Sequence, residues 1–205
     1  MTDSFGEMLA YLKRAITIDL TSRLGSHCLI QAGAGGTGST RHYDAGRLGI
    51  GKSTLVAALT LSGFRYLSDE VAIVAQDGRL LPFQKSIALE QGGSEAITEY
   101  FPCATCSPAP NDVRNIMTAD YPTELLGQSS PAVEFVVLAQ RSTGQAASLS
   151  PVGRSTALAS IVSNRSTWRD SASKGLSGQR ASRLVSGAPP IGLSRPAYPA
   201  LRASK

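Results

Sequence analysis

The stretch DAGRLGIGKSTLVAALTLSGFRYLSDEVAIV, from Asp44 to Val74, decides the fold. It opens with glycines and a lysine, continues through an apolar segment of helical length, and then places two carboxylates between Leu67 and Val71. The order of glycine loop, helix and strand predicts an α/β core with a parallel pair of strands, completed by antiparallel hairpins. Acids at the end of such a strand either cap it at the surface or serve a site.

A complete phosphate-binding motif stands at the start of this stretch. Gly46 to Ser53 satisfies the pattern G-x-x-x-x-G-K-[ST], and Thr54 follows it. Glycines let the backbone turn its N–H groups toward phosphate oxygens, and a helix beginning near Lys52 directs its positive end at the same place. The motif predicts a nucleotide-phosphate site formed by Gly46, Gly49, Ile50, Gly51, Lys52, Ser53 and Thr54.

The same motif predicts a magnesium site and gives the two carboxylates a role. The Ser53 hydroxyl can ligate Mg²⁺, which keeps few protein ligands and needs a carboxylate nearby. If the strand after the helix lies beside the strand before the loop, its end opens onto the phosphates. Asp69 and Glu70 would then hold Mg²⁺ and accept a proton from an attacking hydroxyl, with Asp69 as the essential acid.

The strand that should precede the glycine loop is harder to identify. The residues directly before Gly46 read STRHYDA, which is too polar for an ordinary buried strand, and composition predicts a loop over 33–43. Either Cys28 to Ala32 is the supporting strand and a long loop follows it, or this segment departs from a working phosphate-binding loop.

The rest of the chain predicts a mixed set of elements. Apolar residues at steps of three and four predict an amphipathic helix over 5–24. The remaining predicted elements are strands at 27–35, 64–68, 71–76, 79–83, 86–90 and 132–140, a hairpin turn at 77–78, helices over 52–61 and 155–164, and a weak helix over 179–185. No element is predicted for 91–130.

Charge and composition divide the 205 residues into one domain over 1–165 and a C-terminal segment over 166–205. The net charge of +5 is uneven, because residues 1–140 carry ten basic and fourteen acidic side chains whereas 141–205 carry ten basic and one acidic. The segment 166–205 is rich in Ser, Arg and Pro, and we expect it to be weakly helical or poorly ordered.

Several classes of protein are disfavoured by the composition. The N-terminus does not read as a secretory signal, and no apolar run is long enough to span a membrane. Three cysteines do not suggest a disulfide framework, and the lone CxxC of Cys103 and Cys106 lacks the further ligands of a zinc site. We therefore expect a cytoplasmic protein.

The motifs GIGKST, LSGFRYLSDEVAIV and DGRLLPFQKSIALE together resemble the HPr kinase/phosphorylase family. The resemblance is closest to short HPr-kinase-related proteins without that enzyme's N-terminal domain, some of which phosphorylate serine on a peptide. It is tight over 46–90 and weaker toward both ends. It implies a P-loop kinase core of the HPr-kinase type: a mixed sheet with flanking helices and antiparallel hairpins.

The resemblance also implies an activity and a set of residues. It implies an ATP- and Mg²⁺-dependent kinase that phosphorylates a serine on a protein or peptide, with Lys52, Asp69 and Glu70 in catalysis and Ser53 and Asp69 on the metal. His27 stands where the family has a histidine shortly before the loop strand, which implies an assisting role. The oligomeric state stays open between a monomer and a homo-oligomer.

Three other functions compete with a kinase. A catalytically degenerate ATP-binding regulatory protein would keep the same loop without transferring phosphate. A nucleic-acid-binding protein would use the basic C-terminal segment, but that segment lacks interleaved aromatic residues. A nucleotide-hydrolysing switch would want an acid at the end of a later strand, and the strand over 132–140 ends without one.

Overall fold

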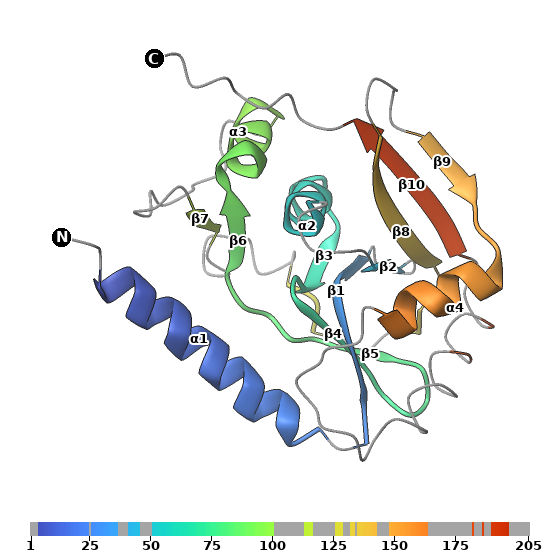
Figure 1. Ribbon diagram of the computed structural model, residues 1–205, viewed down its shortest axis with the longest axis horizontal. Helices are drawn as coiled ribbons and strands as arrows, with labels where there is room; N and C mark the ends of the chain where they lie inside the picture. The colour runs from blue at the N-terminus through green and yellow to red at the C-terminus, as the bar shows by residue number, and fades with distance from the viewer. Residues whose placement is uncertain are drawn as a thin grey trace.

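A computed structural model gives the architecture of the chain (Figure 1). It describes residues 4–24, 26–36, 41–45, 51–100, 113–116, 126–128, 132–133, 135–142, 148–163, 182, 186 and 190–196. The expected mixture of helices and strands is confirmed, because helices pack against a curled, mixed sheet. Among the described helices, none combines the length and the apolar character needed to cross a membrane.

The helices and strands alternate along the chain. The helices are α1 (Ser4–Ser22), α2 (Lys52–Leu61), α3 (Gln91–Tyr100) and α4 (Arg154–Ser163). The strands are β1 (Cys28–Gly36), β2 (Arg41–Ala45), β3 (Arg65–Ser68), β4 (Val71–Val74), β5 (Leu80–Leu81), β6 (Ile87–Glu90), β7 (Val113–Ile116), β8 (Phe135–Ser142), β9 (Ser148–Pro151) and β10 (Pro190–Pro196).

The main sheet has the order β5-β4-β1-β2-β8-β10-β9, with β3 also paired to β1. Its first four strands are antiparallel neighbours, whereas β8 runs parallel to both β2 and β10. The short strands β6 and β7 form a separate antiparallel pair. The sheet therefore changes from antiparallel to parallel at β2, the strand that leads into the glycine loop.

Strand β1 organises the region around the two carboxylates. On one side it pairs with β2, and on the other it pairs with β4 through its first half and β3 through its second half. Strands β3 and β4 thus lie end to end along β1, and Asp69 and Glu70 form the junction between them. The carbonyl of Glu70 accepts a hydrogen bond from Ala32 N, 3.1 Å away, so the junction stays attached to β1.

The prediction that the strand after the loop helix lies beside the strand before it was wrong in one respect. Strands β2 and β3 do run in the same direction, because both are antiparallel to β1, but β1 lies between them. The ends of β2 and β3 face the same stretch of β1, since Ala45 pairs with Ala32 and Ser68 pairs with Ala34. The C-terminal ends of β2 and β3 therefore lie on the two sides of the same part of β1.

The supporting strand is also found where composition predicted a loop. Strand β2 ends directly before Gly46. The strand predicted over 27–35 is confirmed as β1, Cys28–Gly36. Strand β2 pairs on both sides, with β1 and β8, so its backbone hydrogen bonds are satisfied by neighbours whatever the polarity of its side chains. The polarity of a segment indicates whether its side chains are buried, but it does not indicate which strands its backbone pairs with. The pairing of β2 could therefore not be predicted from composition.

The two faces of β1 pack against different helices. Cys28, Ile30, Ala32 and Ala34 belong to a buried cluster that includes Ala157 and Ile161 of α4. Because side chains alternate between faces along a strand, Gly33 and Gly35 lie on the opposite face, which α2 covers. Figure 1 shows α2 between this sheet and the β6–α3 segment, where a second buried cluster joins Val56 to Tyr66, Leu89 and Ile97.

Replacing Gly33 by alanine is expected to destabilise the fold by about 1–3 kcal/mol. A Cβ at this position would clash with Val56 Cγ2, and a β-branched valine cannot easily rotate away, so α2 would have to shift. Urea denaturation measures the change. The matched control is Gly92→Ala in α3, where an added Cβ meets nothing within 4 Å; equal effects of the two substitutions would contradict this packing.

Other differences from the predicted elements lie in the second half of the chain. Helix α3 and strand β7 fall within 91–130, where no element was predicted; Gly92 and Gly93 at the start of α3 weaken its sequence signal. Seven residues of the C-terminal segment form β10, which pairs with β8 and β9. The weak helix predicted over 179–185 lies outside the described residues except for Ser182.

Candidate active site

Helix α2 begins at the last glycine of the phosphate-binding motif. Gly51 is the N-cap residue and has φ 80° and ψ 39°, a left-handed conformation that a residue with a Cβ adopts at a cost. No side chain caps this end of α2. The first turn therefore offers backbone N–H groups and the positive end of the helix dipole to an anion. Residues 46–50 of the motif lie outside the described part of the chain.

The first turn of α2 meets the junction between β3 and β4. The Ser53 hydroxyl hydrogen-bonds the Asp69 carboxylate, and the positive charge of Lys52 is close enough to act on the same group. Lys52 and Asp69 are both buried. Three of the predicted site residues, Lys52, Ser53 and Asp69, therefore lie together in the structure, although they come from two different segments: the start of α2 and the junction between β3 and β4.

The Asp69 carboxylate is held in an unusual state for an aspartate. Burial raises its pKa from 3.8 to about 6, and this effect outweighs the hydrogen bond from Ser53 and the positive charges of Lys85 and Lys52, which lower it. The backbone of Ala88 in β6 supplies a further hydrogen bond. The Oδ1 atom of Asp69 is buried without a hydrogen-bond partner.

Glu70, the second predicted acid, has a different environment. Its carboxylate forms an ion pair with Lys85, and both side chains are about one-third exposed. Burial lowers the pKa of Lys85, and the negative charge of Asp69 opposes that effect. Lys85 thus lies between the two acids, pairing directly with Glu70 and acting on Asp69 through charge.

Replacing Lys85 by methionine is expected to raise the pKa of Asp69 further. The substitution removes a positive charge that favours the ionised carboxylate while it keeps a side chain of similar length. A pH titration of the carboxyl carbon by NMR measures this directly. Arg79→Met, which removes an exposed positive charge at the hairpin, serves as the control; an unchanged or lowered Asp69 pKa in Lys85→Met would contradict the assigned contact.

Helix α3 closes the other side of the first turn of α2. A Cβ added at Gly93 would clash with Thr54 Oγ1, so the two helices approach each other closely at this glycine. Ser94, the next residue, is also buried. Among the described residues, Ser94 Oγ and Asp69 Oδ1 are the two buried side-chain atoms without a hydrogen-bond partner. The predicted phosphate-binding residue Thr54 is therefore engaged in helix packing.

His27 lies away from this cluster. It precedes β1, and its Nδ1 is 3.3 Å from the Ser26 hydroxyl. The junction of Asp69 and Glu70 contacts β1 at Ala32, which is five residues further, roughly 16 Å at the rise of an extended strand. The structure therefore does not bring His27 to the carboxylates.

The cluster fits magnesium as a partial ligand set. Ser53 and Asp69 supply a hydroxyl and a carboxylate, which are oxygen ligands of the kind that Mg²⁺ prefers. Within the described ranges, no group of three or more His, Cys, Asp or Glu side chains could hold a metal ion by itself. Mg²⁺ typically uses one or two protein ligands together with phosphate oxygens and water, so these two residues suit a metal that arrives with a nucleotide.

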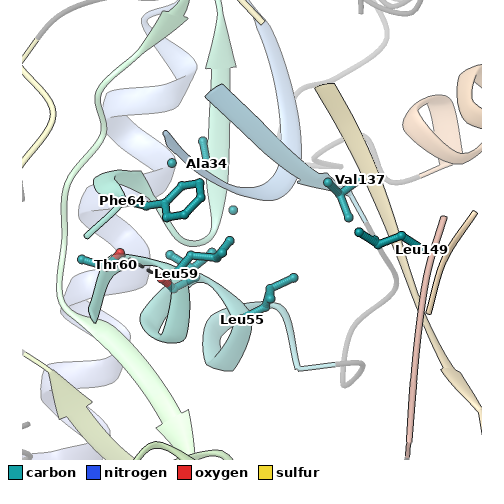
Figure 2. Close-up of a pocket in the computed structure, with 10 residues that line it drawn as sticks. Ala34, Leu55, Leu59, Thr60, Phe64, Val137 and Leu149 are labelled. Atoms are coloured by element: carbon teal, nitrogen blue, oxygen red, sulfur yellow. Dashed lines mark hydrogen bonds between the residues drawn. The ribbon is translucent and has the colours of Figure 1, made fainter. Parts of the chain in front are cut away.

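An apolar pocket lies along α2, on the side that faces the parallel part of the sheet. Its volume is about 290 Å³, and Figure 2 shows Leu55 and Leu59 of α2 opposite Val137 of β8 and Leu149 of β9. The one polar side chain in its lining, Thr60, donates to the carbonyl of Val56. None of the residues assigned to phosphate or metal lines this pocket, so it is separate from the charged cluster.

Sequence reasoning did not identify Lys85 as a part of the site. Lys85 lies in the segment PFQKS. No sequence motif relates this lysine to the two acids, and the two meet only because of how the chain folds.

Comparison with models of known protein families finds no match, and comparison with curated proteins finds none either.

Proposed function

We propose that the chain is an ATP-dependent kinase with an HPr-kinase-type P-loop core, which transfers a phosphoryl group to a serine on a protein or peptide. The observation that carries the proposal is the meeting of Lys52 and Ser53, from the end of a phosphate-binding motif, with a buried, partly unsatisfied Asp69. This combination places positive charge, a metal-binding hydroxyl and a proton acceptor at one helix N-terminus.

Each residue has a role in this reaction. Lys52 and the first turn of α2 would bind the β- and γ-phosphates and offset their charge. Ser53 and the oxygen of Asp69 beside it would hold Mg²⁺, which supplies charge neutralisation when it is bound. Asp69 Oδ1 would accept the serine proton as the bond from serine Oγ to the γ-phosphorus forms and the bond to the β-phosphate oxygen breaks, releasing ADP.

The raised pKa of Asp69 supports this assignment. A carboxylate with a pKa of about 6 is still ionised at neutral pH, and it is a stronger base than an ordinary aspartate. Glu70 is less suited to the same duty because Lys85 pairs with it. We therefore assign the proton transfer to Asp69 and a positioning role to the pair of Glu70 and Lys85.

A second candidate function is a catalytically silent ATP-binding regulatory protein. The pairing of Glu70 with Lys85 favours it, because this pairing leaves Asp69 to serve both the metal and the proton. The two functions share nucleotide binding and differ in phosphate transfer.

The test uses the purified full chain, γ-labelled ATP, Mg²⁺ and a library of serine-containing peptides, each with a matched Ser→Ala peptide. A kinase would label serine peptides and leave their alanine counterparts unlabelled. ATP binding without any labelled peptide would support the silent binder. Failure to bind ATP would contradict both functions.

A further inference from the structure

Two lysines from distant parts of the chain meet beside the acids of the candidate active site. Lys13 Nζ of α1 donates a hydrogen bond to Ser86 Oγ, 3.0 Å away. Ser86 follows Lys85, whose ammonium forms the ion pair with Glu70. Burial lowers the pKa of Lys85 and the positive charge of Lys13 lowers it further, so the two ammonium groups lie close enough to repel each other. Lys13 and Lys85 are called the lysine pair below.

The fold holds both members of the lysine pair in place. Lys13, Thr17 and Thr21 follow one another at steps of four residues, so they lie on one side of α1. The two threonines are buried, and their hydroxyls donate to the carbonyls of Lys13 and Thr17 at 2.8 and 2.7 Å. Lys85 is held by its ion pair with Glu70. A side chain that is already ordered loses less conformational entropy when it binds a ligand.

The lysine pair lies on the solvent side of the site. The side chains of Lys85 and Glu70 are about one-third exposed, whereas Asp69 and Lys52 are buried. Lys13 is partly exposed as well. An ammonium group can donate three hydrogen bonds, so neither the contact with Glu70 nor the contact with Ser86 excludes a further acceptor. An anion that arrives from solvent can therefore interact with both ammonium groups and offset the repulsion between them.

The position of the lysine pair favours an anion of the acceptor over a phosphate of the nucleotide. Figure 1 shows β6 between α1 and α2, and Ser86, the partner of Lys13, directly precedes β6. The phosphates of ATP are assigned to the first turn of α2, on the other side of this strand. In an in-line transfer, the attacking serine approaches the γ-phosphate from the side away from ADP. An anion held on the α1 side of β6 is therefore best placed to belong to the acceptor.

The charge of the surrounding chain makes this gathering of lysines specific. Residues 1–140 carry ten basic and fourteen acidic side chains, so most of this part of the chain repels an acidic segment. Positive side chains that meet at one place then decide where such a segment can bind. We propose that Lys13 and Lys85 bind the carboxylate of an acidic residue close to the serine that is phosphorylated. This inference rests on the proposed kinase activity and adds the class of acceptor, which is an acidic peptide.

The test compares matched acceptor peptides, using the full chain, γ-labelled ATP and Mg²⁺. Each peptide holds a single serine and, at one position within about four residues of it, either glutamate or glutamine. Because these two side chains differ in charge and hardly in shape, the ratio of their kcat/KM values measures recognition of the carboxylate. At one position or more, the glutamate peptide should be favoured about tenfold or more, and the ratio should fall as the salt concentration rises.

Variants of Lys13 connect this preference to the lysine pair. Lys13→Met is expected to reduce the ratio to about threefold or less, because it removes one of the two cations and keeps the apolar stem. Arg14→Met is the matched control, since Arg14 is exposed one residue further along α1 and points about 100° around the helix. Lys13→Glu should favour a peptide with lysine in place of glutamate. Circular dichroism checks the fold of each variant.

Three results would overturn the acceptor site and leave the kinase proposal standing. One is labelling of serine with equal kcat/KM for glutamate and glutamine peptides at every position. Another is a glutamate preference that both Lys13 variants retain. The third is a higher KM for ATP in Lys13→Met with an unchanged peptide ratio, which would assign the lysine pair to the nucleotide.

If no peptide is labelled, the kinase proposal fails, and fluorescence anisotropy of the same peptides tests the acceptor site separately. Tighter binding of a glutamate peptide than of its glutamine counterpart, lost in Lys13→Met and kept in Arg14→Met, would support the site. Equal affinities for the two peptides at every position would overturn it.

Discussion

Replacing Lys52 by alanine is expected to reduce phosphoryl transfer to serine about 10²- to 10³-fold and to weaken ATP binding. Lys52 is buried at the first position of α2, and its positive charge acts on Asp69. Without it, the phosphate charge is offset only by the helix end and the metal. The measurement is the rate of transfer from γ-labelled ATP to a serine peptide.

Two further variants make the Lys52 result interpretable. Lys52→Met keeps the apolar stem in its buried position, so a similar loss of activity in both variants identifies the charge as the cause. Arg79→Ala removes an exposed positive charge at the hairpin and should leave transfer unchanged. Normal turnover by a folded Lys52→Ala protein would contradict the assignment of α2 as the phosphate-binding helix.

Replacing Asp69 by asparagine is expected to abolish transfer and, at the same time, to stabilise the protein at pH 8. The folded chain raises the pKa of Asp69 from 3.8 to about 6, so keeping this group ionised costs folding free energy. A shift of this size corresponds to roughly 3 kcal/mol, which is the upper limit of the stabilisation expected from asparagine. Such a cost is typical of a residue retained for function.

The sign of the pH dependence follows from the raised pKa. Below about pH 4 the carboxyl is protonated in both the folded and the unfolded chain, so its contribution to stability is fully present. As the pH rises toward 6 and beyond, the unfolded chain loses this proton first, and the folded chain loses stability. Asp69→Asn and wild type should therefore be similar near pH 4 and diverge at higher pH, with the variant more stable.

Urea denaturation at pH 4 and pH 8 measures this difference. Asp77→Asn is the control, because Asp77 is exposed at the hairpin turn and the substitution should have the same small effect at both pH values. An Asp69→Asn variant that is less stable than wild type at pH 8 would show that the buried carboxylate stabilises the fold. That result would remove the main physical reason for treating Asp69 as a functional residue.

The local parts of the site could be predicted from the sequence because their determinants are local. The helix start at Lys52 follows from the glycine motif, and the break at Asp69 follows from two acids between apolar runs. Their meeting needs only that α2 returns the chain beside β1, which the short turn at Gly63 allows. The glycine motif therefore predicted Lys52 and Ser53, and the acids after the next strand predicted Asp69, which the structure brings to them.

The remaining features depend on contacts between distant segments. Strand β2 exists because β1 and β8 pair with it, and its polar composition gives no sign of this. Lys85 reaches Glu70 across fifteen residues, and periodicity cannot reveal such a contact. The apolar pattern of α1 predicted the helix but not which side faces solvent, because that depends on contacts with distant segments, such as the hydrogen bond from Lys13 to Ser86.

Calorimetric titration of ATP into the wild type and Asp69→Asn proteins, each with Mg²⁺ and with EDTA, tests the site most directly. If Ser53 and Asp69 hold a metal that arrives with the nucleotide, Mg²⁺ should tighten ATP binding about tenfold or more in the wild type and by less than about twofold in Asp69→Asn. Equal enhancement by Mg²⁺ in both proteins, or no ATP binding by the wild type, would show that these residues do not form one nucleotide site.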